Sequence, residues 1–166
     1  AAVPDDGVAI GDMCGIVYTG TALWQSAAER SWHYAGGFCT LGCAMPMGIG
    51  AKLAMPEVPM VVMVGDAGFQ FTSTELATAY EQRLPLPIII WNNDGLGAIE
   101  GHMDNMGVQR VAVEYGSSNP DFLALAKAYH CHAERPQSLA ELTQAVERAF
   151  TADRPTVIEV LERIDW

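Results

Sequence analysis

Two short, uninterrupted apolar runs constrain the fold of this 166-residue chain more than any other feature. Residues 59–64 and 86–91 contain no charged side chain, and each run is followed by a polar loop. Apolar runs of this length are typical of strands that are buried on both faces, as in a parallel sheet. We therefore expect Asp66 and Asn93, which follow the two runs, to lie side by side at the sheet edge where open α/β sheets bind ligands.

The rest of the chain alternates between strand and helix patterns. Further strands are expected at 8–10, 130–133 and 156–160, and helices at about 13–28, 41–55, 72–83, 119–129 and 138–150. A polar, aromatic loop is expected at 31–38 and an irregular stretch at 92–118. This alternation predicts an α/β fold, a doubly wound parallel sheet with helices on both faces.

Three of the expected helices have a recognisable start. Thr72 with Glu75, and Ser138 with Glu141, form the pattern of a capping box, in which each side chain accepts from the backbone amide of the other residue. Asn119, which precedes a proline, is expected to cap the helix that follows it.

Length and charge narrow the function class. The length and the 50% hydrophobic content predict one compact domain over residues 1–166. The net charge of −11 argues against nucleic acid and anionic membranes as partners, because both favour a basic surface. No apolar stretch approaches the roughly 20 residues that a bilayer crossing requires.

Processing and redox signals indicate a cytoplasmic protein. The four cysteines form no CxxC pair and are too few for a disulfide scaffold, so reduced thiols are expected. The first residues have neither the basic region nor the apolar core of a signal peptide. The chain also begins without Met, which favours a piece of a longer polypeptide.

The expected strand ends present oxygen ligands. Asp66 offers a carboxylate, Asn93 an amide oxygen, and the loop just after Asn93 a backbone carbonyl. Few protein oxygens, completed by phosphate and water, are what Mg²⁺ prefers. The amides of Ala67 and Gly68 precede the expected helix start at Thr72 and can donate to an anion.

Two competing motifs are weaker. Residues 48–53 resemble a dinucleotide fingerprint, but the third glycine is missing and the segment lies within an expected helix, where small residues serve packing. His130 and His132 flank Cys131 with a spacing that could bind metal, but no suitable third ligand lies near them in the sequence.

At this point the residues carry a family resemblance. The segment 65–69 with the pair Asn92-Asn93, together with segment 40–42 and helix 46–51, resembles the diphosphate-binding domain of thiamine diphosphate enzymes. Within that family the sequence is most similar to the branch of acetolactate synthases and 2-oxo acid decarboxylases.

The resemblance implies roles for particular residues. Mg²⁺ would be held by the side chains of Asp66 and Asn93 and by the carbonyl of Gly95. Leu41 would support the bent cofactor, with the carbonyl of Cys39 accepting from its 4′-amino group. The implied cofactor-binding residues are Cys39, Leu41, Gly65, Ala67, Gly68, Phe71 and Asn93.

The resemblance also implies a missing half. The catalytic glutamate of the family belongs to a pyrimidine-binding domain, and no glutamate of this sequence lies in such a motif. We therefore expect no catalytic residue in this chain, an inert isolated domain, and a pyrimidine-binding domain or subunit as partner in a homo-oligomer. The family also often places side chains against the diphosphate at 12–16, where only backbone groups and a thiol are expected here.

The substrate side is expected to be acidic. His33, Glu100 and His102 lie where relatives shape the substrate site, and Asp94 and Asp104 add negative charge. An acidic lining suits a cationic 2-oxo acid, as in relatives similar to 5-guanidino-2-oxopentanoate decarboxylase. A solvated acidic loop is the alternative explanation.

Three other functions remain open from the sequence. The first is a carboligase of the acetolactate synthase type, and the second is a non-catalytic module for cofactor binding or assembly. The third is a domain that binds flavin or another nucleotide, although the acidic ribose-binding residue of such domains cannot be placed.

Overall fold

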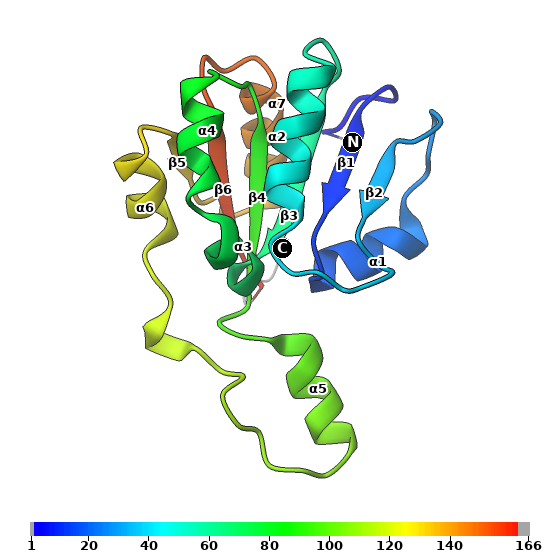
Figure 1. Ribbon diagram of the computed structural model, residues 1–166, viewed down its shortest axis with the longest axis vertical. Helices are drawn as coiled ribbons and strands as arrows, with labels where there is room; N and C mark the ends of the chain where they lie inside the picture. Colours follow the sequence, from blue (N-terminus) through cyan, green and yellow to red (C-terminus); the bar gives the residue numbers. More distant parts are fainter. Residues whose placement is uncertain (1, 163–166) are drawn as a thin grey trace.

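The computed structural model describes residues 2–162, with the side chain of residue 117 excepted. Within this part six strands form one all-parallel sheet in the order β2-β1-β3-β4-β6-β5 (Figure 1). The strands are β1 (Val8–Gly11), β2 (Trp32–Tyr34), β3 (Met60–Gly65), β4 (Pro87–Asn92), β5 (His132–Glu134) and β6 (Thr156–Leu161).

Helices cover both faces of the sheet. The helices of the described part are α1 (Gly15–Leu23), α2 (Ala44–Ala54), α3 (Asp66–Thr72), α4 (Glu75–Glu81), α5 (Gly97–Asn105), α6 (Phe122–Ala128) and α7 (Leu139–Ala149), with a 3₁₀ turn η1 (Gly116–Ser118). Helices α2, α4 and α6 contribute to one buried cluster and α1 and α7 to another. The predicted doubly wound α/β fold is confirmed.

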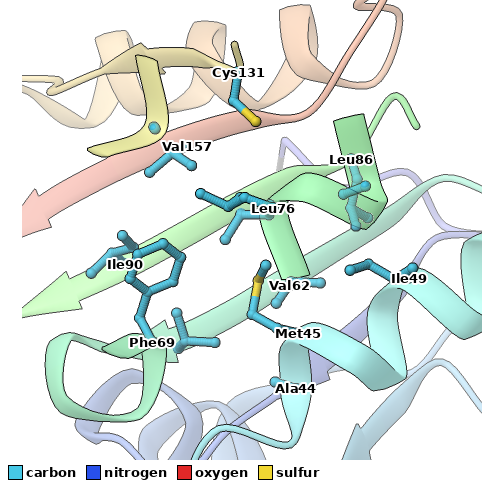
Figure 2. Close-up of a cluster of buried hydrophobic side chains, with 14 of the residues drawn as sticks. Ala44, Met45, Ile49, Val62, Phe69, Leu76, Leu86, Ile90, Cys131 and Val157 are labelled. Atoms are coloured by element: carbon cyan, nitrogen blue, oxygen red, sulfur yellow. The ribbon is translucent and has the colours of Figure 1, made fainter. Parts of the chain in front are cut away.

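Successive residues of the central strands face opposite clusters. Val62 and Ile90 belong to the cluster that Figure 2 shows, together with Met45 of α2 and Leu76 of α4. Val61 belongs to the cluster on the other face. Both faces of β3 and β4 are therefore buried, which explains why their sequences are continuously apolar.

The strand order places a topological switch point between β1 and β3. The chain runs from β1 outward to β2 and then returns to place β3 on the other side of β1. Parallel α/β sheets bind their ligands in the crevice outside such a point. The register aligns Gly65 with Trp91, so the residues that follow β3 and β4 emerge at the same edge.

Two elements were not expected from the sequence. β2 lies within the expected loop 31–38 and is a three-residue edge strand that pairs Ala9 with Trp32. α5 lies within the expected irregular stretch, and Figure 1 shows it extending beyond the carboxyl ends of the strands. No residue of α5 is buried, so its sequence has no core-facing periodicity that could reveal a helix.

The prediction of a capping box at Thr72 and Glu75 is wrong. α3 begins at Asp66, directly after β3, and Thr72 is its last residue. The Thr72 hydroxyl instead donates to the Gly42 carbonyl over 2.8 Å. Glu75 opens the separate helix α4, where its carboxylate accepts from the hydroxyl of Thr78.

The other two helix starts differ in outcome. Asn119 does not cap α6, because Asp121 does so by accepting from the amide of Ala124 at 2.9 Å. Ser138 caps α7 as predicted and accepts from the Glu141 amide at 3.2 Å. The carboxylate of Glu141 accepts from the amide of residue 137, one position before the expected partner.

None of the helices in the described part combines the length and apolar character that a membrane crossing requires.

Candidate functional site

A cleft of about 490 Å³ lies at the switch point. It is lined by the residues that follow three neighbouring strands, among them Cys14 after β1, Asp66 after β3 and Asn93 after β4. Tyr18, Leu41, Trp91 and Ile99 give the cleft a largely apolar wall. The strand-end rule thus brings the two predicted metal ligands into one cleft.

Three oxygen atoms converge inside this cleft. The side-chain oxygen of Asn93 lies 2.9 Å from the Gly95 carbonyl oxygen and 3.1 Å from Asp66 Oδ1, with no hydrogen-bond donor between them. If the amide were turned by 180°, its nitrogen would donate to both oxygens. Octahedral coordination at about 2.0–2.1 Å places neighbouring oxygens about 2.9 Å apart. In the present orientation both distances therefore suit neighbouring oxygen ligands of one Mg²⁺ ion.

Glycine is required at two positions beside these oxygens. A β-carbon on Gly95 would lie 2.4 Å from the Val113 carbonyl oxygen, and one on Gly97 would lie 2.3 Å from the Asn93 amide nitrogen. A larger residue would displace the loop backbone at position 95 and the Asn93 side chain at position 97. The close packing of this loop determines where the Gly95 carbonyl points.

Asp66 is a carboxylate that the fold buries. Its exposed fraction is 1%, and burial raises the pKa of Asp66, while hydrogen bonds from Asn119 and from backbone amides oppose this effect. A buried carboxylate without a cation is costly, and a bound cation removes this cost. The electrostatics of the site therefore agree with the geometry.

Asn119 is the residue beside Asp66 that the sequence did not reveal. Its Nδ2 donates to Asp66 Oδ2 over 2.7 Å. The sequence pattern predicted a helix cap here because asparagine before proline is common at helix starts. Asn119 follows no strand, so the strand-end rule could not have selected it.

A buried polar chain supports the end of β4. Glu159 on β6 is 2% exposed, accepts from Asn92 Nδ2 at 2.7 Å, and is paired with Arg135 at 2.6 Å. Asn92 Oδ1 in turn accepts from the Asp94 amide at 3.0 Å. The first asparagine of the pair therefore holds the loop, while the second faces the cleft.

Ala67 and Gly68 lie within the first turn of α3 and not before a later helix, as the sequence had predicted. Gly65 precedes this helix without a side-chain cap. Amides in a first helical turn have no intrahelical partner and can donate to an anion. The amides of Ala67 and Gly68 thus belong to a helix and not to a loop, and they can still donate to a phosphate group.

The turn that carries Leu41 is held by a second buried carboxylate. Asp12 is 1% exposed and accepts from the amides of Met13 at 2.8 Å and Gly42 at 2.5 Å. Gly42 has a φ of +83°, which favours glycine. Asp12 does not line the cleft, so the expectation that segment 12–16 offers the diphosphate only backbone groups and a thiol stays a prediction.

The structure does not bring every predicted residue to the cleft. Cys39 and Phe71 are exposed and do not line the cleft, so their roles stay predictions. His33, whose Nε2 lies 2.7 Å from a backbone carbonyl, does not line the cleft either, and neither do Glu100 and His102 on α5, so their roles also stay predictions.

The acidic residues of the α5 region surround a cation of the chain itself. Arg110 pairs with Asp104 at 2.5 Å, with Glu114 at 2.7 Å, and with Glu100 at 3.5 Å. Part of the predicted acidic lining is therefore neutralised internally.

The competing motifs have structural explanations. A β-carbon on Gly48 would lie 2.2 Å from Val62 Cγ2, so this glycine allows α2 to approach the sheet. His132 pairs with Asp153 at 2.9 Å, whereas the ring of His130 packs against Tyr80. Among the described residues no three His, Cys, Asp or Glu side chains cluster as a metal site. This result is compatible with a site built from one carboxylate and neutral oxygens.

Comparisons with known proteins agree with this geometry. Residues 10–160 match the model of the thiamine pyrophosphate enzyme family for its C-terminal TPP binding domain. The chain is 43% identical over 161 residues to the probable 2-ketoarginine decarboxylase of Pseudomonas aeruginosa, covering 96% of this chain and 28% of that protein. It is 32% identical over 137 residues to the probable acetolactate synthase large subunit of Methanococcus aeolicus, covering 82% of this chain and 23% of that protein.

A solved structure has the same fold. The thiamine diphosphate-dependent 4-hydroxybenzoylformate decarboxylase of Rhodococcus jostii RHA1 superposes with a TM-score of 0.85 and 27% sequence identity, over 99% of this chain and 31% of that chain. The chain thus spans less than a third of these proteins. Because the family model covers almost its whole length, the chain belongs to the thiamine pyrophosphate enzymes and corresponds to their C-terminal TPP binding domain.

Proposed function

We propose that this domain holds thiamine diphosphate through Mg²⁺ as part of an enzyme that decarboxylates a 2-oxo acid. The proposal of a metal rests on the convergence of Asp66 Oδ1, the Asn93 side-chain oxygen and the Gly95 carbonyl at distances that suit an octahedron. The proposal of thiamine diphosphate rests on the family match. The reaction is supported by relatives named as decarboxylases.

Different residues of the chain would hold the metal, the diphosphate and the rest of the cofactor. Asp66, Asn93 and Gly95 would hold the metal, and the first-turn amides of Ala67 and Gly68 would donate to the diphosphate. Leu41, which lines the cleft, would support the cofactor. When bound, thiamine diphosphate supplies the electron sink on which a 2-oxo acid loses CO₂.

The apolar wall has a separate task. Tyr18, Trp91 and Ile99 exclude water from the cleft, and an environment poor in water favours the loss of a carboxylate charge. The group that exchanges protons with the cofactor would come from a pyrimidine-binding domain or subunit in a homo-oligomer. The four free cysteines agree with a reducing compartment such as the cytoplasm.

The test of cofactor binding is calorimetry on the complete enzyme with and without Mg²⁺. Thiamine diphosphate should bind only with Mg²⁺, and Asp66→Ala should weaken binding by more than about 100-fold, beyond the range that outer-shell partners produce. Asp153→Ala removes an exposed carboxylate far from the cleft and serves as the control. Binding by Asp66→Ala at the wild-type affinity would reject the proposed site.

The substrate in this proposal is a cationic 2-oxo acid with a guanidino group. Its support is the name of the P. aeruginosa relative, a probable 2-ketoarginine decarboxylase. Decarboxylation of 5-guanidino-2-oxopentanoate should be faster, as kcat/KM, than that of aliphatic 2-oxo acids of equal length. Equal kcat/KM values for the two kinds of substrate would reject the guanidino specificity but not the decarboxylase activity.

A carboligase is the second candidate, because the methanococcal relative is named an acetolactate synthase. The two reactions share the loss of CO₂ and differ in whether a proton or a second oxo acid is added. Product analysis with pyruvate separates them, since a carboligase forms acetolactate and a decarboxylase forms an aldehyde. Metal-dependent cofactor binding without any turnover would indicate the third alternative, a non-catalytic module.

A further inference from the structure

The side chain of Asn119 is held beside the proposed metal site by several hydrogen bonds. Its Nδ2 lies 2.7 Å from Asp66 Oδ2 and 3.3 Å from both Asn92 Oδ1 and Asp94 Oδ1. Its Oδ1 accepts from Gln70 Nε2 at 3.1 Å. The amide therefore uses both its donors and its acceptor, and it bridges α3 to the end of β4.

This arrangement fixes the plane of the Asp66 carboxylate. One oxygen, Oδ2, accepts from Asn119, while the other, Oδ1, faces the side chain of Asn93 at 3.1 Å. Rotation of the carboxylate out of this plane would break the 2.7 Å bond in a buried environment, where an unpaired polar group is costly. Asn119 therefore restrains the carboxylate without contacting the metal position.

Asn119 reaches the site from a distant part of the chain. It lies 53 residues from Asp66, just after the excursion that contains α5. The base of this excursion is closed by pairing of Gly95 with Glu114 and by a 2.8 Å bond from the Leu96 amide to the Val113 carbonyl. The returning segment thus holds both the Gly95 carbonyl and the Asp66 carboxylate.

We propose that Asn119 is a positioning residue for the metal site, which orients Asp66 so that Oδ1 points toward the cation. This inference rests on the proposed function and extends it to a residue that does not line the cleft. Outer-shell partners of metal-binding carboxylates typically change metal affinity by about 10–100-fold.

The test compares Asn119→Leu with Asn105→Leu in the complete enzyme. Leucine has nearly the shape of asparagine but donates no hydrogen bond, and Asn105 is exposed at the end of α5, away from the cleft. Mg²⁺ is titrated at fixed thiamine diphosphate and followed by tryptophan fluorescence, since Trp91 lines the cleft. The Mg²⁺ dissociation constant should rise about 10-fold for Asn119→Leu and stay unchanged for Asn105→Leu.

A second measurement separates positioning from a structural role. Saturating Mg²⁺ should restore the wild-type affinity for thiamine diphosphate in Asn119→Leu, although its metal-free melting temperature should fall below that of the control because Asp66 Oδ2 loses its partner. If the Mg²⁺ constant is unchanged, or if saturating Mg²⁺ does not restore cofactor binding, the inference is overturned. Asn119→Ala repeats the measurement without added volume if the leucine variant does not fold. Absence of metal-dependent binding in the wild type would instead reject the proposed function.

Discussion

Asp12 Oδ2 accepts a hydrogen bond from the Gly42 amide at 2.5 Å, and this bond joins the end of β1 to the turn that carries Leu41. The Gly42 carbonyl accepts from the Thr72 hydroxyl at 2.8 Å, so the turn is also tied to α3. Leu41 is therefore held in the cleft by neighbours that do not line it.

Replacing Asp12 should loosen this turn. Asp12→Ala leaves the amides of Met13 and Gly42 without their acceptor, and unpaired buried donors cost about 1–3 kcal/mol each. We expect lower stability in urea unfolding and a lower kcat, with the Mg²⁺ dissociation constant unchanged because Asp66 and Asn93 are not touched. A weakened Mg²⁺ affinity with normal stability would contradict this assignment.

Two glycines of α2 should respond in opposite ways to the same substitution. Gly48→Ala places a methyl group 2.2 Å from Val62 Cγ2 and should destabilise the domain by about 1–3 kcal/mol. Gly50→Ala meets no atom within 4 Å and should stabilise the helix by about 0.5–1 kcal/mol. Denaturant unfolding of both variants measures the difference, and equal effects would show that α2 does not depend on close approach to β3.

Asp66→Asn should stabilise the metal-free protein while abolishing Mg²⁺ binding. An amide nitrogen at this position can donate to the side-chain oxygen of Asn93, while its oxygen keeps the bond from Asn119. We expect a gain of about 1 kcal/mol, the usual net contribution of a hydrogen bond. Thermal melting without metal measures the gain, and calorimetry measures the loss of Mg²⁺ binding.

The pH dependence of this gain follows from the direction of the pKa shift. Burial raises the folded-state pKa of Asp66 above its ordinary value of 3.8, so wild-type stability falls as pH rises from 3.8 through the raised pKa. The gap to Asp66→Asn should widen from pH 4 to pH 7. Asp153 is the control of opposite sign, since Arg154 lowers its pKa and the stability it contributes is lost as pH falls.

The four cysteines should differ in reactivity. Cys39 is exposed, whereas burial raises the pKa of the Cys14 thiol to about 12 and that of Cys131 to about 11. Because the thiolate is the reactive form, a short maleimide pulse at pH 7 should label Cys39 and leave Cys14 and Cys131 unmodified until the protein is denatured. Peptide mass spectrometry reads out the labelled positions. Rapid labelling of Cys14 in the native protein would show that its pocket opens to solvent.

Local sequence patterns were sufficient where burial imposes them. β3 and β4 are covered on both faces, so their apolar runs and the polar residues after them, Asp66 and Asn93, could be read directly. The patterns failed where packing imposes none. α5 buries no residue, and β2 is a short edge strand.

Local patterns were thus enough to predict the parallel α/β fold, the cleft at the strand ends and the residue types that suit a metal and a diphosphate. They did not predict that Asn119 holds Asp66 instead of capping a helix, or that Asp12 holds the Gly42 turn. Both contacts are long-range in the sequence. These contacts join residues that are 53 and 30 positions apart, and such a partner is chosen by the packing of the whole sheet and not by neighbouring residues.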